Sequence, residues 1–291
     1  MSWHTSGDVD EFLARAGDFL RSRPVENTML LTLADTLRTR GPHAFGPDDP
    51  IFGWWAEDAG VVRAAFLQTP PWPVLLTAMP PGAVAALVEL LAGRPVGGVN
   101  GLVADAEEFA AAWNRPYRPG MQTRLYRLDE LTPPGPGPPG AARVATAGDR
   151  RLLIGWLEAF HLDIGEVRRD VEDQVDDKLA YGGFLLWEVD GQPVALAGRT
   201  RPEAGMVRVI AVYTPPDLRG RGYGGAATVA VTRAALDEGA TDVVLFTDRS
   251  NPTSNALYQR LGYRPVQDRT VLEFESSSSP APPTTGVKAA S

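Results

Sequence analysis

The 291-residue chain contains no cysteine and only three histidines. Without cysteine it cannot form a disulfide, use a thiolate as a nucleophile or bind zinc through thiolates. The histidines, His4, His43 and His161, do not have the spacing of metal ligands, so we expect no metal cofactor.

Long apolar runs and an excess of positive charge are also missing. No apolar run reaches the ~18 residues needed to span a membrane, and residues 1–8 lack the features of a secretory signal. The net charge of −8 argues against broad binding to nucleic acid. We therefore expect a cytoplasmic protein without a membrane or nucleic-acid partner. Its richness in arginine, alanine, glycine and proline suggests a bacterial source, and the oligomeric state stays open.

Two proline-rich stretches divide the chain. Residues 132–141 contain prolines and glycines at a density that neither a helix nor a central strand can sustain. Residues 276–291 are of low complexity, and we expect them to be disordered. The sequence thus predicts an N-terminal domain over 1–131, a linker over 132–141 and a C-terminal domain over 142–275.

Hydrophobic periodicity predicts an α/β (α+β) fold in both halves, each with a mixed, mostly antiparallel sheet flanked by helices. In the C-terminal half the order is helices 150–161 and 167–181, strands 183–189, 193–199 and 206–213, helix 226–236, strand 242–247, helix 254–261 and strand 269–274. The N-terminal half has a similar order: helices 12–22 and 28–39, strands 52–57, 61–69 and 74–77, helices 83–91 and 106–113, and a closing strand 123–128.

The most informative motif stands between strand 206–213 and the helix after it. It reads Arg219-Gly220-Arg221-Gly222-Tyr223-Gly224-Gly225, which is Arg-x-x-Gly-x-Gly. Glycines let a backbone approach a ligand closely, and the first N–H groups of a helix have no partner within it. A strand, a glycine-rich turn and a helix therefore predict a cradle for a diphosphate.

Two other phosphate-binding motifs are not favoured. The P-loop string, Gly-x-x-x-x-Gly-Lys-Ser/Thr, does not occur. Residues 220–225 contain Gly-x-Gly-x-x-Gly, the dinucleotide fingerprint, but a segment so dense in glycine produces it by accident. A nucleotide-dependent oxidoreductase is therefore a weak alternative.

A second motif follows strand 242–247. It runs from Asn251 through Tyr258 to Gly262-Tyr263, and we expect Ser254 and Asn255 to cap its helix and Gly262 to end it. In this order and at this separation, the two motifs resemble those of the GNAT superfamily of acyl-CoA-dependent N-acetyltransferases, over roughly residues 182–274. The N-terminal half resembles a second, degenerate GNAT domain.

The resemblance implies roles for particular residues. Backbone groups at the end of strand 206–213 would bind the acyl group and the pantetheine arm of acetyl-CoA, and the glycine-rich turn would hold its pyrophosphate. Tyr258 would be the general acid for the departing thiolate, which suits a phenol of pKa about 10. The implied acetyl-CoA contacts are Val212, Tyr213, Thr214, Arg219, Gly220, Arg221, Gly222, Tyr223, Gly224, Gly225, Asn251 and Asn255.

The chain departs from the family at the general base. Many members carry a glutamate early on the strand before Asn251, where this chain has Phe246. Asp248, Glu188 or a water molecule remain as candidates. In the N-terminal half, Ala78-Met79-Pro80-Pro81-Gly82 stands where the cradle motif would be, so we expect no acyl-CoA site there and a structural role for that half.

The expected function is an N-acetyltransferase that transfers an acetyl group from acetyl-CoA to a primary amine of a small molecule by direct attack. The alternative is a non-catalytic acyl-CoA-binding regulatory or scaffold protein, which the missing carboxylate at Phe246 favours slightly. The amine and the preferred acyl chain are not readable from the sequence.

Overall fold

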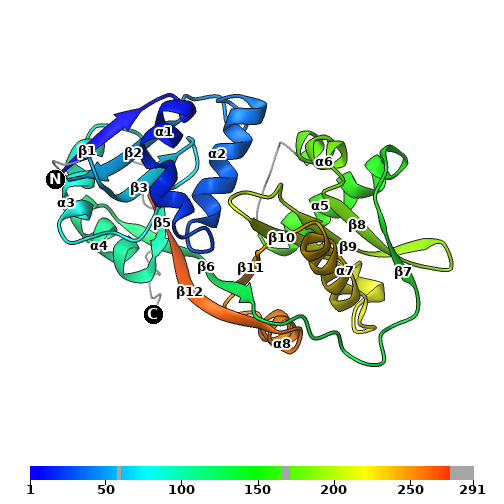
Figure 1. The fold of residues 1–291 in the computed structure, drawn as a ribbon. Helices are drawn as coiled ribbons and strands as arrows, with labels where there is room; N and C mark the ends of the chain where they lie inside the picture. The colour runs from blue at the N-terminus through cyan, green and yellow to red at the C-terminus, as the bar shows by residue number, and fades with distance from the viewer. Residues whose placement is uncertain (58–59, 166–170, 276–291) are drawn as a thin grey trace, which may run out of the picture.

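The computed structural model describes residues 1–57, 60–165 and 171–275. Their strands form one sheet in the order β1-β2-β3-β4-β5-β12-β6-β11-β10-β9-β8-β7 (Figure 1). The strands are β1 (Ser2–Ser6), β2 (Ile51–Ala56), β3 (Val62–Gln68), β4 (Val74–Leu76), β5 (Gly98–Leu102), β6 (Tyr117–Leu128), β7 (Ala141–Val144), β8 (Phe184–Val189), β9 (Gln192–Arg199), β10 (Met206–Tyr213), β11 (Asp242–Asp248) and β12 (Tyr263–Phe274).

Helices cover both faces of this sheet. They are α1 (Val9–Arg21), α2 (Thr28–Arg40), α3 (Ala83–Leu91), α4 (Val103–Trp113), α5 (Arg150–Asp163), α6 (Val171–Ala180), α7 (Tyr223–Asp237) and α8 (Pro252–Arg260). Only β4–β5 and β10–β11 are parallel pairs, so the predicted mixed, mostly antiparallel sheet flanked by helices is confirmed. Among the described residues, none of the helices combines the length and apolar character needed to span a membrane.

The sequence patterns located most elements but missed three strands. All three are short: β1 is mostly polar, β5 contains two glycines and β7 has only four residues, Ala-Ala-Arg-Val, so no clear alternation marks them. β7 begins at Ala141, the last residue of the predicted linker. The expected helix 167–181 is seen from Val171 onward, and residues 167–170 and the tail 276–291 lie outside the described residues.

Alternation along the strands assigns each helix to one face. Val207, Val209 and Leu245 belong to the apolar cluster that α7 covers, whereas Phe184 and Leu196 belong to the cluster under α5 and α6 on the opposite face. In the N-terminal half, α1 and α2 cover one face and α3 and α4 cover the other. Each half is therefore a sheet layer between two helical layers.

The last strand of each half lies in the sheet of the other half. β6 ends the N-terminal half, yet it pairs antiparallel with β11, where Leu245 faces Tyr126. β12 ends the C-terminal half, yet it pairs antiparallel with β5, where Leu272 faces Val99. The sequence analysis treated these strands as the closing strands of their own halves, because alternation within a strand carries no information on its partner.

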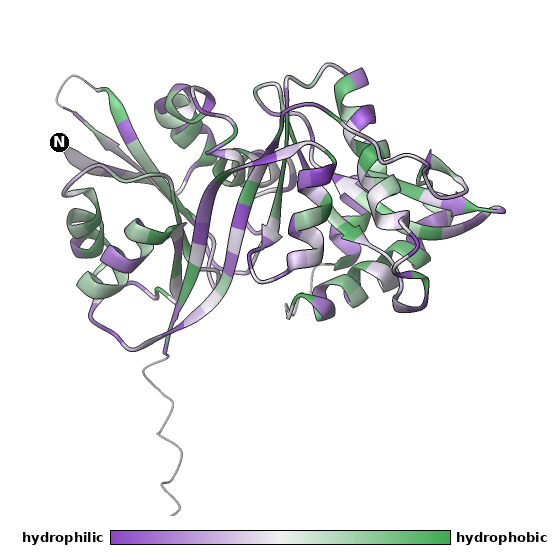
Figure 2. Ribbon diagram, turned by 90° about the horizontal axis from the view of Figure 1, so that it is seen from below, coloured by the Kyte–Doolittle hydropathy of each residue, from purple (hydrophilic) through white to green (hydrophobic). Residues whose placement is uncertain are grey.

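β6 and β12 also pair with each other, antiparallel from Tyr117 and Phe274 at one end to Leu128 and Tyr263 at the other. Figure 2 shows hydrophilic residues along the long strands in the middle of the molecule. Arg124 and Asp268 are one such cross-strand pair, joined by two hydrogen bonds of 2.6 and 2.8 Å. A backbone ladder and ion pairs thus connect the halves, in place of a purely apolar interface.

Further contacts join the N-terminal helices to the C-terminal half. Thr28 Oγ1 lies 3.2 Å from the sulfur of Met206, and Arg40 on α2 forms a 3.5 Å ion pair with Asp173 on α6. The two halves therefore meet along the strands and along the α2 side as well.

The strand exchange predicts that the halves stay together after the linker is cut. A protease site inserted between Gly135 and Pro136, in an exposed part of the linker, should be cleaved without separating the fragments. β6 would remain between β11 and β12, so the fragments should co-elute in size-exclusion chromatography and separate only in denaturant. Separation under native conditions would contradict the exchange.

Candidate active site

The candidate site lies where two parallel strands of the C-terminal half diverge. β10 and β11 pair from Met206 and Asp242 to Val209 and Leu245. Both strands continue for several residues beyond that point without pairing to each other, because β11 stays paired with β6 and β10 stays paired with β9. Backbone groups on the facing edges of the two strands are therefore free to bind a ligand.

A bulge in β10 marks the start of this opening. The register between β10 and β9 shifts between Ile210 and Tyr213, and Ala211 has φ +48°. A non-glycine residue in the left-handed region is uncommon, and such bulges re-aim backbone groups. The predicted contacts Val212, Tyr213 and Thr214 follow the bulge directly.

The glycine-rich turn forms the expected cradle at the start of α7. Gly220 and Gly222 have φ +78° and +84°, values that an L side chain rarely adopts. Gly222 is the N-cap of α7 and provides no side-chain cap. Among the described residues, none accepts a hydrogen bond from the backbone N–H groups of residues 220–225, although Ala226 bonds back to Gly222. These N–H groups, at the positive end of the helix dipole, suit an anion.

Neighbouring elements hold the cradle against the diverging strands. A Cβ on Gly224 would lie 3.2 Å from Thr214 Oγ1, and one on Gly225 would lie 3.2 Å from a methyl group of Leu257 on α8. The first turn of α7 therefore touches both the end of β10 and α8. Tyr223, which follows the cap, is buried in the core.

The two arginines of the motif point away from the helix start. Arg219 Nε donates to the carbonyl of Thr214 at 2.9 Å, and its guanidinium pairs with Asp163 on α5. Arg221 donates to the carbonyl of Asp217 at 3.1 Å. Their hydrogen bonds fix the shape of the turn, while both side chains remain partly exposed to solvent.

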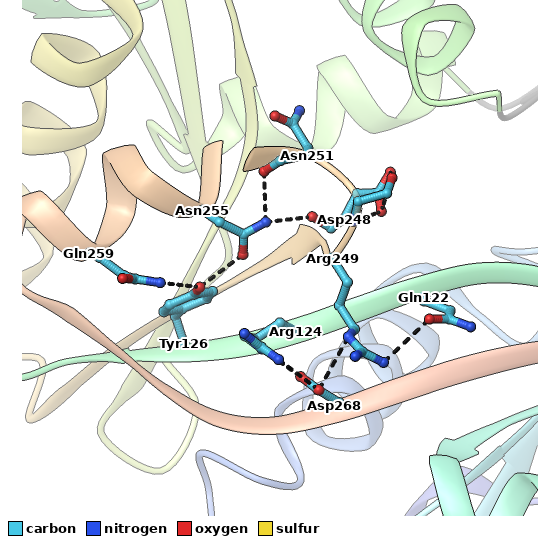
Figure 3. A network of polar contacts seen from close by, with 10 residues as sticks. Gln122, Arg124, Tyr126, Asp248, Arg249, Asn251, Asn255, Gln259 and Asp268 are labelled. Carbon is cyan, nitrogen blue, oxygen red and sulfur yellow. Dashed lines mark hydrogen bonds and ion pairs between the residues drawn. The ribbon is translucent and has the colours of Figure 1, made fainter. Parts of the chain in front are cut away.

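Asn251 and Asn255 organise the loop between β11 and α8 (Figure 3). Asn251, and neither Ser254 nor Asn255, is the N-cap of α8, and it accepts a hydrogen bond from Ser254 N at 3.0 Å. The amide nitrogen of Asn255 donates to the carbonyls of Asp248 and Asn251 at 2.8 and 2.7 Å. Both N–H bonds of that amide are thus used within the protein. Gly262, with φ +97°, follows the last residues of α8 as predicted.

Tyr126 connects this loop to the N-terminal half, a contact that the sequence analysis missed. Its hydroxyl donates to Asn255 Oδ1 at 2.8 Å and accepts from Gln259 Nε2 at 3.1 Å (Figure 3). Tyr126 lies on β6, so α8 is oriented by a strand from the other half. No local signal could reveal this contact, because the strand is more than 100 residues away along the chain.

Ion pairs extend the same network along β6 and β12. Asp268 on β12 lies between Arg124 on β6 and Arg249, which follows β11, with Arg249 Nε at 3.2 Å (Figure 3). Arg249 also contacts Gln122 Oε1 at 3.3 Å. The pKa of Asp268 is lowered, mainly because its carboxylate accepts hydrogen bonds from the Arg124 guanidinium. The loop between β11 and α8 is thus tied to both exchanged strands.

Tyr258 lies on α8 with 8% of its surface exposed. Its ring contacts that of Tyr263 edge-on, with centroids 6.2 Å apart. Burial raises the pKa of Tyr258 to about 12, so the phenol stays protonated at neutral pH. The neighbouring Tyr263 hydroxyl is hydrogen-bonded to Thr232 at 2.6 Å, whereas no described residue bonds to the Tyr258 hydroxyl. Tyr258 can therefore offer its proton to a ligand.

The candidates for the general base lie in different surroundings. Glu188 on β8 accepts a 2.7 Å hydrogen bond from Arg143, and β8 stands three strands from β11 in the sheet. Asp248 ends β11 and accepts hydrogen bonds from Ser250 N and Oγ, each 2.8 Å. Phe246 packs in a small apolar cluster with Val25 of the N-terminal half. Only Asp248 is near the diverging strand ends.

The corresponding place in the N-terminal half is filled by a side chain. β4 and β5 pair only at Val74 and Leu75 and then diverge, like β10 and β11. Arg269 from β12 donates to the carbonyls of Leu76 and Asn100 at 2.9 and 3.0 Å and to Asn100 Oδ1 at 3.2 Å. The guanidinium, 2% exposed, thus uses the carbonyls at the divergence of β4 and β5. Burial lowers the pKa of Arg269 to about 10.

Comparison with known proteins gives a family match for the C-terminal half. Residues 152–263 match the acetyltransferase (GNAT) family. A curated relative, the mycothiol acetyltransferase of Paenarthrobacter aurescens (strain TC1), is 26% identical over 286 residues, which cover 88% of each chain. No group of three or more potential metal ligands occurs among the described residues.

Solved structures resemble the fold over almost the whole chain. An acetyltransferase of the GNAT family from Colwellia psychrerythraea has a TM-score of 0.61 at 10% identity and covers 94% of this chain and 100% of its own. A GCN5-related N-acetyltransferase from Sphaerobacter thermophilus has a TM-score of 0.60 at 16% identity, covering 93% and 94%. At these identities the likeness concerns the fold, and it extends over both halves.

The buried guanidinium of Arg269 predicts a large loss of stability on its removal. Arg269→Met should lower the free energy of unfolding by about 2–4 kcal/mol, because two buried carbonyls lose their donor. Arg118→Met is the control, since its exposed ion pair with Glu273 should contribute less than about 1 kcal/mol. Urea unfolding measures both, and equal effects of the two variants would contradict the assigned role.

Proposed function

We propose that the chain transfers an acetyl group from acetyl-CoA to the primary amine of a small molecule, because residues 152–263 match the acetyltransferase (GNAT) family. One observation carries the proposal. A row of backbone N–H groups at residues 220–225, to which no described residue bonds, adjoins diverging strands and a protonated Tyr258. Together they offer a phosphate cradle, a channel for a thioester and an acid.

Acetyl-CoA would bind with its pyrophosphate on the N–H groups of the cradle. Its pantetheine arm would continue the sheet along the free edge of β10 after the bulge, at Val212 to Thr214. Strand-like pairing of this kind fixes an extended ligand at several backbone groups. We place Arg219 and Arg221 as residues that shape the turn, and Asn251 and Asn255 as residues that position α8, because their side chains bond mainly within the protein.

The amine would attack the thioester carbonyl directly. A backbone N–H beyond the bulge would stabilise the oxyanion as the C–N bond forms. The C–S bond then breaks, and Tyr258 would donate its proton to the departing thiolate. The raised pKa of Tyr258 supports this role, since a phenol that stays protonated serves as an acid and not as a base.

The proton lost by the amine needs an acceptor. Glu188 is hydrogen-bonded to Arg143 and lies on a strand three strands away from β11. We therefore assign proton removal to Asp248, directly or through a water molecule. The N-terminal half would not bind acetyl-CoA, since Arg269 uses the equivalent carbonyls. The curated relative is named for mycothiol, which supports a small-molecule acceptor for this chain too.

Tyr258→Phe separates catalysis from binding. We expect kcat to fall on the order of 10²-fold, because general acid catalysis contributes at least that factor, while the Kd for acetyl-CoA stays within about twofold. Thiol release measures turnover, and isothermal titration measures binding. Tyr263→Phe, which removes a nearby buried hydroxyl bonded to Thr232, is the control and should keep its kcat. An unchanged kcat in Tyr258→Phe would favour the alternative of a non-catalytic acyl-CoA-binding protein.

Gly222→Glu tests the cradle itself. The side chain would place bulk and negative charge on the N–H groups, so isothermal titration should detect no binding of acetyl-CoA, against one site per chain in the unmodified protein. Gly239→Glu is a matched control, because Gly239 also has a positive φ and follows the other end of α7. It should bind acetyl-CoA normally. Equal loss in both variants would attribute the effect to backbone strain.

A further inference from the structure

A cluster of basic side chains lies on the face of the sheet opposite α7, where the two halves meet. It consists of Arg208 on β10, Lys178 on α6, Arg201 just before β10, and Arg40 on α2. The ion pair between Arg40 and Asp173 shows that side chains of α2 and α6 meet here. The cluster is therefore built by elements of both halves.

The carboxylates nearby are already paired with other residues of the region. Asp177 accepts hydrogen bonds of 2.8 and 3.3 Å from Arg201, and Asp173 pairs with Arg40. On α2, Asp35 pairs with Arg38 at 3.1 Å. Among the described residues, none forms a hydrogen bond or an ion pair with the side chains of Lys178 and Arg208. Asp177 is the carboxylate that acts on Lys178, but Arg201 holds both of its oxygens, so neither cation has a carboxylate partner of its own.

These two cations are also partly removed from water. Arg208 Nε is buried and has no hydrogen-bond partner, and Lys178 and Arg208 are both half-buried residues. Burial lowers the pKa of Arg208 to about 10 and that of Lys178 to about 8, and the positive charges of Arg208, Arg40 and Arg201 add to the shift at Lys178. An unpaired buried charge destabilises a fold, so its presence indicates a function.

The position of Arg208 relates the cluster to the reaction. Val207 and Val209 face α7, so Arg208 between them faces the other side of β10. Arg208 lies one residue before the end of the β10–β11 pairing and three residues before the bulge at Ala211, about 10 Å along the strand. The cradle lies at the start of α7, so Arg208 and the cradle stand on opposite faces of β10.

We propose that Arg208 and Lys178 form an anion subsite that binds a carboxylate or phosphate group of the acceptor. This inference rests on the proposed function, in which an amine accepts the acetyl group. It adds that the amine substrate carries a negatively charged group about 10 Å from its reactive nitrogen. The guanidinium and ammonium bind that group through charge-assisted hydrogen bonds in a region of low water content. Binding of the anion supplies the counter-charge that the protein itself lacks.

Matched amine pairs test the subsite by kinetics. The pairs are 6-aminohexanoate with hexylamine, and glucosamine 6-phosphate with glucosamine, so the two arms distinguish a carboxylate from a phosphate. With acetyl-CoA as donor, we expect at least one anionic member to exceed its neutral counterpart tenfold or more in kcat/KM. Equal use of both members in both pairs would overturn the proposal.

Arg208→Met removes the charge and keeps the length of the side chain. It should raise KM for the preferred anionic amine at least tenfold while KM for the neutral amine and for acetyl-CoA stays within twofold. Arg63→Met, which removes an exposed arginine paired with Glu57, is the control and should change none of these values. Equal loss for the charged and neutral amines would show a structural role for Arg208 and overturn the proposal.

Thermal unfolding gives a readout that does not depend on catalysis. Without ligand, Arg208→Met should have a Tm equal to or above that of the unmodified protein, because a buried unpaired charge is removed. Sodium phosphate at constant ionic strength should raise the Tm of the unmodified protein and of Arg63→Met more than that of Arg208→Met. A lower Tm or failure to fold in Arg208→Met, or an equal phosphate response, would overturn the subsite. Failure of acetyl-CoA to bind would instead overturn the proposed function.

Discussion

The reciprocal placement of β6 and β12 is the constraint on which the rest of the structure depends. Each strand is paired on both sides, β6 by β11 and β12, and β12 by β5 and β6. A strand at an open edge leaves unpaired N–H and C=O groups, so the exchange removes the inner edge of each half. At Gly98 the backbones approach so closely that a Cβ would lie 2.6 Å from the carbonyl oxygen of Leu272. The halves are therefore one folding unit.

The candidate site depends on this exchange directly. β11 continues past Leu245 in pairing with β6, which draws it away from β10 and opens the space between them. Tyr126 on β6 then orients α8 through Asn255 and Gln259, and α8 carries Tyr258. A strand from the N-terminal half thus shapes both the opening and the position of the acid. That half contributes to the site although it has no cradle of its own.

The same exchange has the opposite effect in the N-terminal half. There β12 brings Arg269 to the divergence of β4 and β5, and its guanidinium occupies the carbonyls that would line an opening. The exchange of a closing strand thus leaves an open space between β10 and β11 in the C-terminal half, whereas it fills the space between β4 and β5 in the N-terminal half. The half-buried cations Arg208 and Lys178 are a third feature where the halves meet, because neither has a hydrogen-bond or ion-pair partner among the described residues.

The sequence by itself determined the local chemistry. Glycines at 220 and 222 are required because the turn needs positive φ, the nearly continuous apolar runs of β8 to β11 follow from burial on both faces, and Tyr258 follows Asn251 at a helical spacing. Only the tertiary structure decided where β6 and β12 pair, that Asn255 bonds to Tyr126, that Arg269 lies buried at the divergence of β4 and β5, and that Arg208 Nε is buried without a partner. The reason is physical: backbone angles and amphipathic patterns are set by neighbours in the chain, whereas the partners of β6, β12 and Arg269 are residues more than 100 positions away.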